Sequence, residues 1–88
     1  MGMWIRSQDK ENLINVNKIE ITDFCDAHKN AIWGDDILLG RYSSKEKALK
    51  VLDMIQEFIK NMYAGMANYI GKPFQMPLDS EVEEWVNL

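Results

Sequence analysis

The sequence is poor in residues that build covalent or metal-bound frameworks. It has one cysteine and one histidine in 88 residues, which excludes an internal disulfide. The stretch 23–28 (DFCDAH) holds Asp, Cys and His side chains that could ligate a metal, and Cys25 with His28 is a conceivable nucleophile–base pair. A closed zinc site needs a second pair of Cys or His ligands, and a catalytic pair needs an orienting third group. We therefore interpret 25–30 as a turn and expect no metal and no cofactor.

Long apolar runs are also absent. No stretch approaches the roughly 18 apolar residues of a membrane-spanning helix, and residues 1–20 lack the apolar centre of a signal peptide. A single cysteine fits a reducing compartment. These absences predict a cytoplasmic protein with no membrane partner.

The chain has no excess of positive charge. Its net charge is −4 and its pI is about 4.8, which argues against general binding to nucleic acid. Phosphate-binding glycine loops are missing, because Gly34 and Gly40 stand alone, and the paired Asp35 and Asp36 fit a turn. With no credible catalytic set, we expect a protein that is not an enzyme.

What the sequence does contain is a pattern of strands followed by a helix. A chain of 88 residues predicts one domain, residues 1–88. Alternating apolar residues predict strands at 3–8, at 13–24 with a bulge near Asn17, and at 31–33 and 37–42 around a Gly-Asp-Asp loop. These segments predict an α+β fold: a four-stranded antiparallel meander followed by one long helix, a short edge strand at 74–76 and a short C-terminal helix at 79–88.

The helix has the clearest local signals. "SSKE" (43–46) reads as a capping box in which Ser43 caps the helix and Glu46 reaches back. Gly65 marks its expected end. Its apolar stripe comprises Ala48, Leu52, Ile55, Ile59, Met62 and Met66.

Some apolar surface has no obvious cover in a fold with one long helix. Strand 37–42 is apolar on both faces, and Trp4 and Phe24 add aromatic area. An exposed apolar sheet face favours association, so we expect a homodimer or a higher symmetric oligomer. The alternative is that the helix at 79–88 folds back over this face.

The two arginines are the best candidates for ligand contact. Arg6 and Arg41 both lie on predicted strands, and alternation puts Trp4, Arg6 and Gln8 on one side of strand 3–8. A guanidinium next to an aromatic ring can hold a phosphate and a stacked base. Residue chemistry alone favours the alternative, in which both arginines pair with Glu20 or Asp23 across the sheet.

Three segments carry a family resemblance: "WIRSQD" (4–9), the helix junction from Leu39 to Ala48, and "FQMP" (74–77). They resemble small proteins of bacteriophages and mobile elements of Gram-positive bacteria, and the chain is similar to the type-one anti-Thoeris sponge family. The resemblance implies a symmetric assembly in the cytoplasm of a bacterial host. It implies binding of a cyclic ADP-ribose-type or cyclic oligonucleotide immune signal without cleavage. The ligand-binding residues that it implies are Trp4, Arg6, Gln8, Arg41, Phe74 and Gln75.

Two other functions are compatible with the same residues. A phage-encoded protein-interaction module could inhibit a host protein through its sheet face or its acidic segment 79–84. The second of these functions is that of a structural or accessory protein with no activity of its own.

Overall fold

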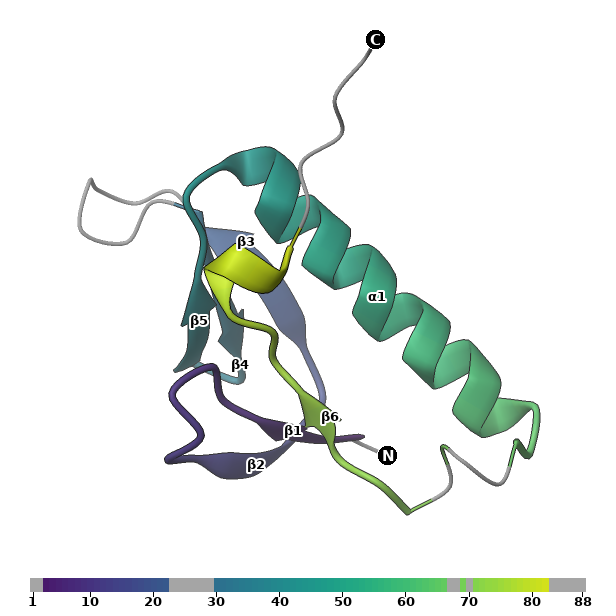
Figure 1. Ribbon diagram of the computed structural model, residues 1–88. Helices are drawn as coiled ribbons and strands as arrows, with labels where there is room; N and C mark the ends of the chain where they lie inside the picture. The colour runs from purple at the N-terminus through teal and green to yellow at the C-terminus, as the bar shows by residue number, and fades with distance from the viewer. Residues whose placement is uncertain (1–2, 23–29, 67–68, 70, 83–88) are drawn as a thin grey trace, which may run out of the picture.

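In the part of the chain that the structure describes, six short strands and one long helix form the fold, which confirms the expected α+β class. The structure is a computed structural model that describes residues 3–22, 30–66, 69 and 71–82. Five strands precede the helix, and one strand and a 3-10 turn follow it (Figure 1). The elements are β1 (Met3–Arg6), β2 (Leu13–Val16), β3 (Ile19–Thr22), β4 (Ala31–Gly34), β5 (Ile37–Arg41), α1 (Lys45–Tyr63), β6 (Phe74–Gln75) and η2 (Asp79–Glu81).

The strands divide into two sheets of order β2-β1-β6 and β3-β4-β5. Consecutive strands within each sheet are antiparallel, as in a meander, but the predicted strand 13–24 breaks at Asn17 and Lys18. The Asp35 carboxylate accepts hydrogen bonds from both backbone N–H groups at this break, at 2.9 and 3.0 Å. The phase change near Asn17 is therefore where the chain leaves one sheet for the other.

Strand β6, which follows α1 in the chain, forms one edge of the first sheet, next to β1. It pairs parallel with β1, with Phe74 opposite Ile5 and Gln75 opposite Arg6. This confirms a short edge strand in the predicted segment 74–76. Of the predicted terminal helix, the described residues form only η2; residues 83–88 lie outside them.

Helix α1 begins one residue later than the capping-box pattern predicts. Ser44 is the N-cap, and its Oγ accepts the Lys47 N–H at 3.1 Å. Ser43 lies one residue before the cap, and its own N–H is donated to the Asp79 carboxylate. The helix ends in a Schellman motif, with Met66 N donating to Asn61 O and the left-handed Gly65 N donating to Met62 O.

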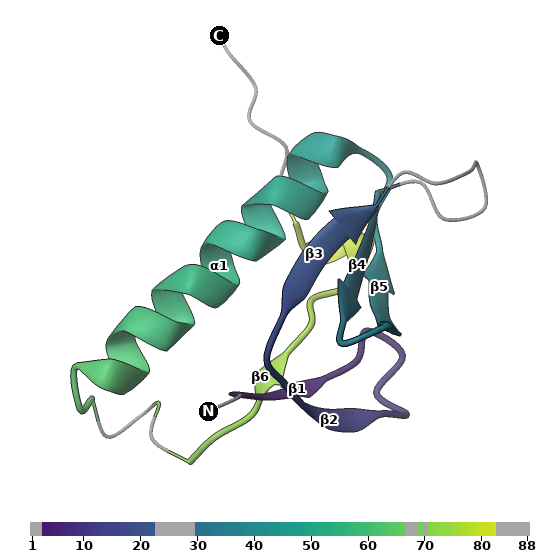
Figure 2. The same cartoon turned by 180° about the vertical axis from the view of Figure 1, so that it is seen from behind.

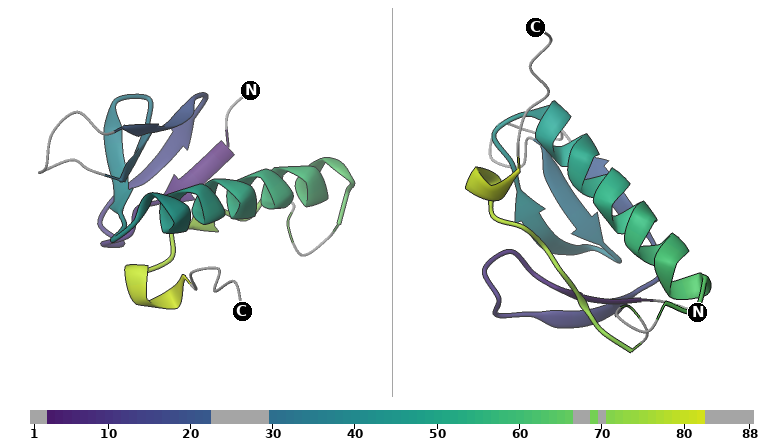
Figure 3. Two further views of the ribbon diagram at one scale, coloured as in Figure 1. Left: turned by 90° about the horizontal axis from the view of Figure 1, so that it is seen from above. Right: turned by 45° about the vertical axis from the view of Figure 1, so that its right-hand side comes forward.

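The core lies between α1 and the inner faces of the two sheets (Figures 2 and 3). Ile5, Ile32, Leu39 and Val51 are at most 1% exposed. The helix contributes the start of the predicted stripe, Ala48 and Ile55, but Met66 at its end is 48% exposed. Among the described residues, neither α1 nor η2 has the length and apolar character needed to cross a membrane.

The segment after β6 is held to the start of α1 by Asp79. Its carboxylate accepts the Ser43 N–H at 2.8 Å and lies 3.6 Å from the Lys47 ammonium. The Ser43 hydrogen bond, together with Lys47, lowers the pKa of Asp79 below its ordinary 3.8. The Asp79 carboxylate therefore stabilises the folded state above about pH 4.

We expect acid to remove this contribution. A depressed pKa means that the stabilisation is lost as the pH falls below about 4 and through the lowered value. In Asp79→Asn the stability of the folded state should depend less on pH in this acid range, because the asparagine amide does not titrate. Thermal unfolding between about pH 6 and pH 2.5 measures the effect. Glu57→Gln, at an exposed position of α1, is the control, and equal acid sensitivity of Asp79→Asn and the parent protein would contradict the assignment.

Candidate functional site

The outer face of the β2-β1-β6 sheet carries the two N-terminal candidates together. Met3 and Ile5 point into the core, so Trp4 and Arg6 point outward, and Trp4 is 53% exposed. Strand β2 contributes Leu13, opposite Arg6 and 50% exposed, and Asn15, opposite Trp4. We call these four residues the outer face. They place an indole and a guanidinium two positions apart on a firmly paired strand.

Neither arginine forms the alternative ion pair with Glu20, the one of the two expected partners that the structure describes. Within the described part of the chain, Arg6 and Arg41 form no salt bridge, and Glu20 instead lies 3.5 Å from Lys18. Asp23 lies outside the described residues, as do Cys25 and His28. The guanidinium of Arg6 is thus available to an anion at the outer face.

Gln8 joins the first sheet to the edge of the second. Its Oε1 accepts the Arg41 N–H at 3.0 Å, and its Nε2 donates to Arg41 O at 3.1 Å and to Pro77 O at 3.3 Å. Its backbone N–H donates to Leu39 O at 2.7 Å. The Gln8 amide therefore pairs with edge strand β5 as a neighbouring strand would, and it positions Arg41 beside the end of β1.

Replacing Gln8 by alanine should destabilise the protein by about 1–3 kcal/mol. The change leaves the Arg41 N–H and C=O groups without their side-chain partner, whereas Pro77 O keeps the hydrogen bond from the Tyr42 hydroxyl at 2.8 Å. Unpaired backbone groups cost more than the lost side-chain atoms. Urea unfolding of Gln8→Ala measures it. Gln56→Ala, an exposed glutamine on α1, should change the free energy of unfolding little, and equal effects of the two would contradict this role.

A shallow hollow of about 210 Å³ lies beside this junction. Gln8 and Arg41 line it together with the Ser7–Asp9 turn and residues 38–40 of β5. The Ser7 hydroxyl and the Glu11 N–H donate to the Asp9 carboxylate and lower its pKa. Arg41 therefore supplies the positive charge of this hollow, and the ionised Asp9 carboxylate, which accepts both hydrogen bonds, supplies a negative one.

The two C-terminal candidates lie differently from the expectation. Phe74 is only 7% exposed, and its ring packs edge-to-face on Phe58 at 5.4 Å and 78°. The side chain of Gln75 donates to Ser7 O at 3.0 Å and to Met76 O at 2.9 Å. In this chain Phe74 belongs to the core and does not present its ring to a ligand, so Trp4 is the aromatic group next to Arg6.

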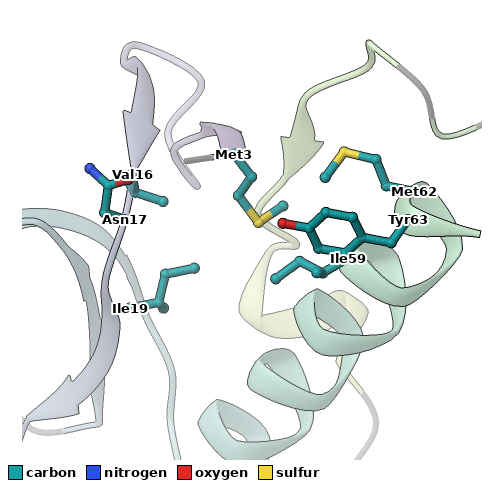
Figure 4. Close-up of a pocket in the computed structure, with 7 residues that line it drawn as sticks. All are labelled: Met3, Val16, Asn17, Ile19, Ile59, Met62 and Tyr63. Carbon is teal, nitrogen blue, oxygen red and sulfur yellow. The ribbon is translucent and has the colours of Figure 1, made fainter. Parts of the chain in front are cut away.

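A second hollow lies between the last turns of α1 and the junction of the sheets (Figure 4). It measures about 90 Å³ and is lined by Met3, Val16, Asn17, Ile19, Ile59, Met62 and Tyr63. Tyr63 is 69% exposed and points across it. This volume suits one aliphatic group and is well below the roughly 300 Å³ at which small-molecule pockets begin.

Comparison with protein-family models, with curated proteins and with solved structures found no match to this chain. The functional argument therefore rests on the side chains themselves. The described residues contain no group of three His, Cys, Asp or Glu side chains placed to hold a metal ion. Sequence reasoning missed Leu13 and Asn15 as parts of the outer face, although their own alternation with Ile14 and Val16 was a usable signal.

Proposed function

We propose that this protein binds and sequesters a nucleotide-type signal at its outer face without cleaving it. The observation that carries the proposal is the pair Trp4 and Arg6, both outward on β1, with the arginine free of ion pairs in the described part of the chain. Stacking of one base on an aromatic ring contributes about 1–3 kcal/mol, and a guanidinium binds phosphate through two hydrogen bonds. Arg41, positioned by Gln8, is a second candidate phosphate contact.

The shape of the surface favours a site shared between copies of the chain. The outer face is a sheet surface, and the two hollows described above, about 90 and 210 Å³, are each smaller than a nucleotide pocket. A second copy facing the sheet would supply the missing wall. The proposed ligands are the cyclic ADP-ribose-type and cyclic oligonucleotide signals that the family resemblance implies, and the proposed role is anti-defence in the cytoplasm of a phage-infected bacterium.

Thermal unfolding with a panel of these ligands tests the proposal. A ligand at 100 times its dissociation constant adds about 2.7 kcal/mol to the native state, which raises Tm by roughly 10 °C or more in a domain of this size. Arg6→Ala and Trp4→Ala should each lose the shift. Lys60→Ala removes an exposed charge from α1 and should keep it. If ligand-free protein shows no shift with any of the panel, the proposal fails.

A second candidate function is a protein-interaction module, which the exposed Leu13 favours. An aliphatic side chain that is 50% exposed, opposite Arg6 and diagonal to Trp4, suits a protein surface better than a phosphate. Under this alternative, Leu13→Ala should weaken partner binding as much as Trp4→Ala does. Under the nucleotide proposal, Leu13→Ala should leave most of the thermal shift in place.

A further inference from the structure

On the outward edge of β2, two backbone N–H groups have no acceptor among the described residues. They lie between two other N–H groups, each of which donates to an aspartate side chain. The backbone hydrogen bond from Ser7 N to Asn12 O, at 2.8 Å, fixes which residues of β2 face β1. In an antiparallel pair these alternate, so Ile14 and Val16 point their N–H and C=O groups to β1. Leu13 and Asn15 point theirs away from it.

Aspartate side chains terminate this edge at both ends. The Glu11 N–H is taken by the Asp9 carboxylate at 2.9 Å, and the Asn17 N–H by the Asp35 carboxylate at 2.9 Å. Between them, within the part of the chain that the structure describes, Leu13 and Asn15 have no hydrogen-bond partner for their outward N–H groups. Among the described residues, no helix or strand lies beyond β2 on this side in Figures 1 and 2.

We propose that β2 of a second copy pairs antiparallel with this edge across a two-fold axis at Ile14, which joins two three-stranded sheets into one of six strands. Leu13 of each copy then lies opposite Asn15 of the other, and each such pair exchanges two backbone hydrogen bonds. The occupant is a second copy because a two-fold pairing needs a self-complementary edge, and Leu13–Val16 carries no charge that would oppose itself. The charged groups lie beyond the paired span: Glu11 and Lys18, and the Asp9 and Asp35 carboxylates, which in this register face each other between the two copies at either end.

Ile14 adds a side-chain contact on the other face of the sheet. It is half-buried against the core, and its backbone groups point to β1. At the axis it therefore forms a non-hydrogen-bonded pair with Ile14 of the partner subunit, the arrangement in which side chains approach most closely. The exposed parts of both isoleucines are covered in the dimer.

The pairing also orders the outer face. Trp4 lies opposite Asn15, and Arg6 lies opposite Leu13. A line of side chains across the joined sheet therefore runs from Trp4 through Asn15 of one copy to Leu13 and then Arg6 of the partner subunit. Three inter-strand steps of about 4.8 Å separate them by about 14 Å. The inference deepens the proposed function, on which this use of the face rests, because it joins the outer faces of two copies into one continuous surface that carries both tryptophans and both arginines.

Sedimentation velocity over a range of protein concentrations, with no ligand present, tests the pairing. Asn15→Pro removes an outward N–H that the chain itself does not use, and proline is tolerated at such edge positions. We expect Asn15→Pro to raise the dimer dissociation constant by about tenfold or more, and Asn15→Ala, which keeps the N–H, to change it by less than about threefold. A monomer at every soluble concentration, or a dimer that Asn15→Pro leaves unchanged, would overturn the pairing.

Amide hydrogen exchange of the unmodified protein decides the matter if Asn15→Pro does not fold. The Leu13 and Asn15 amides should exchange slowly when the dimer is populated and rapidly on dilution, whereas the Ile14 amide should stay protected in both states. Rapid exchange of Leu13 and Asn15 in a fully dimeric sample would overturn the inference. Because no ligand enters these experiments, a dimer that binds no nucleotide would contradict the proposed function alone.

Discussion

Replacing Gly34 by alanine is expected to destabilise the protein by about 1–3 kcal/mol, the usual cost of overpacking a core. Gly34 ends β4 where the two sheets approach each other. A Cβ atom there would lie 2.7 Å from Val16 Cγ1 and 2.9 Å from Leu39 Cδ1, both shorter than any relaxed contact. Val16 and Leu39 are 2% and 1% exposed, so neither can move aside into solvent.

A double-mutant cycle with Val16→Ala measures this clash directly. Val16→Ala alone should destabilise the protein by emptying part of the core. In the Gly34→Ala background the same truncation removes the clashing methyl group, so the double variant should be clearly more stable than the sum of the two changes predicts. Urea unfolding gives the three free energies. Additive effects within about 0.5 kcal/mol would show that the new methyl group does not meet Val16.

Replacing Asp35 by alanine is expected to destabilise the protein by about 2–4 kcal/mol. The change removes both hydrogen bonds that hold Asn17 and Lys18 at the break between the sheets. It also places alanine at a φ of +47°, in the left-handed region that aspartate, asparagine and glycine tolerate better. Thermal or urea unfolding of the variant measures the sum of the two effects.

A series at the same turn separates the hydrogen bonds from the backbone conformation. Asp35→Gly keeps the conformation and loses the bonds, and Asp35→Asn keeps the conformation and one acceptor oxygen, so Asp35→Asn should be the mildest change. Asp36→Ala places alanine at a φ of +72° and therefore measures the destabilisation that comes from the backbone conformation alone. If Asp36→Ala destabilises the protein as much as Asp35→Ala, the carboxylate does not join the sheets.

Local signals explain which parts of the fold were predictable. The stop of α1 at Gly65 and the β4–β5 hairpin depend on residues a few positions apart, and both were located from the sequence. The cap is Ser44 and not Ser43, and the Ser43 N–H is donated to Asp79, far along the chain. The division into two sheets depends in the same way on Asp35, which looked like an ordinary turn residue.

The candidate site shows the same limit at the level of side chains. Alternation along β1 predicted that Trp4 and Arg6 lie on one side of the strand, and the structure confirms this. Sequence pattern does not reveal whether an amide side chain is engaged by the backbone, as the side chains of Gln8 and Gln75 are. Nor does it tell a surface ring from a core ring: Phe74 became buried because parallel pairing with β1 places it beside Ile5, on the side that faces Phe58.

The pairing of β6 with β1 also sets an order of folding. Contacts between these strands, such as Gln75 Nε2 to Ser7 O, join residues 68 positions apart, whereas β3, β4 and β5 contact their sequence neighbours. Long-range closure is slow, and the isolated β1–β2 hairpin is at best marginally stable. During synthesis the first sheet is therefore completed only when almost the whole chain has been made. A truncation just before Phe74 would turn β1 into an edge strand, held to the rest of the fold by its core side chains and by the hydrogen bonds of Gln8 to β5.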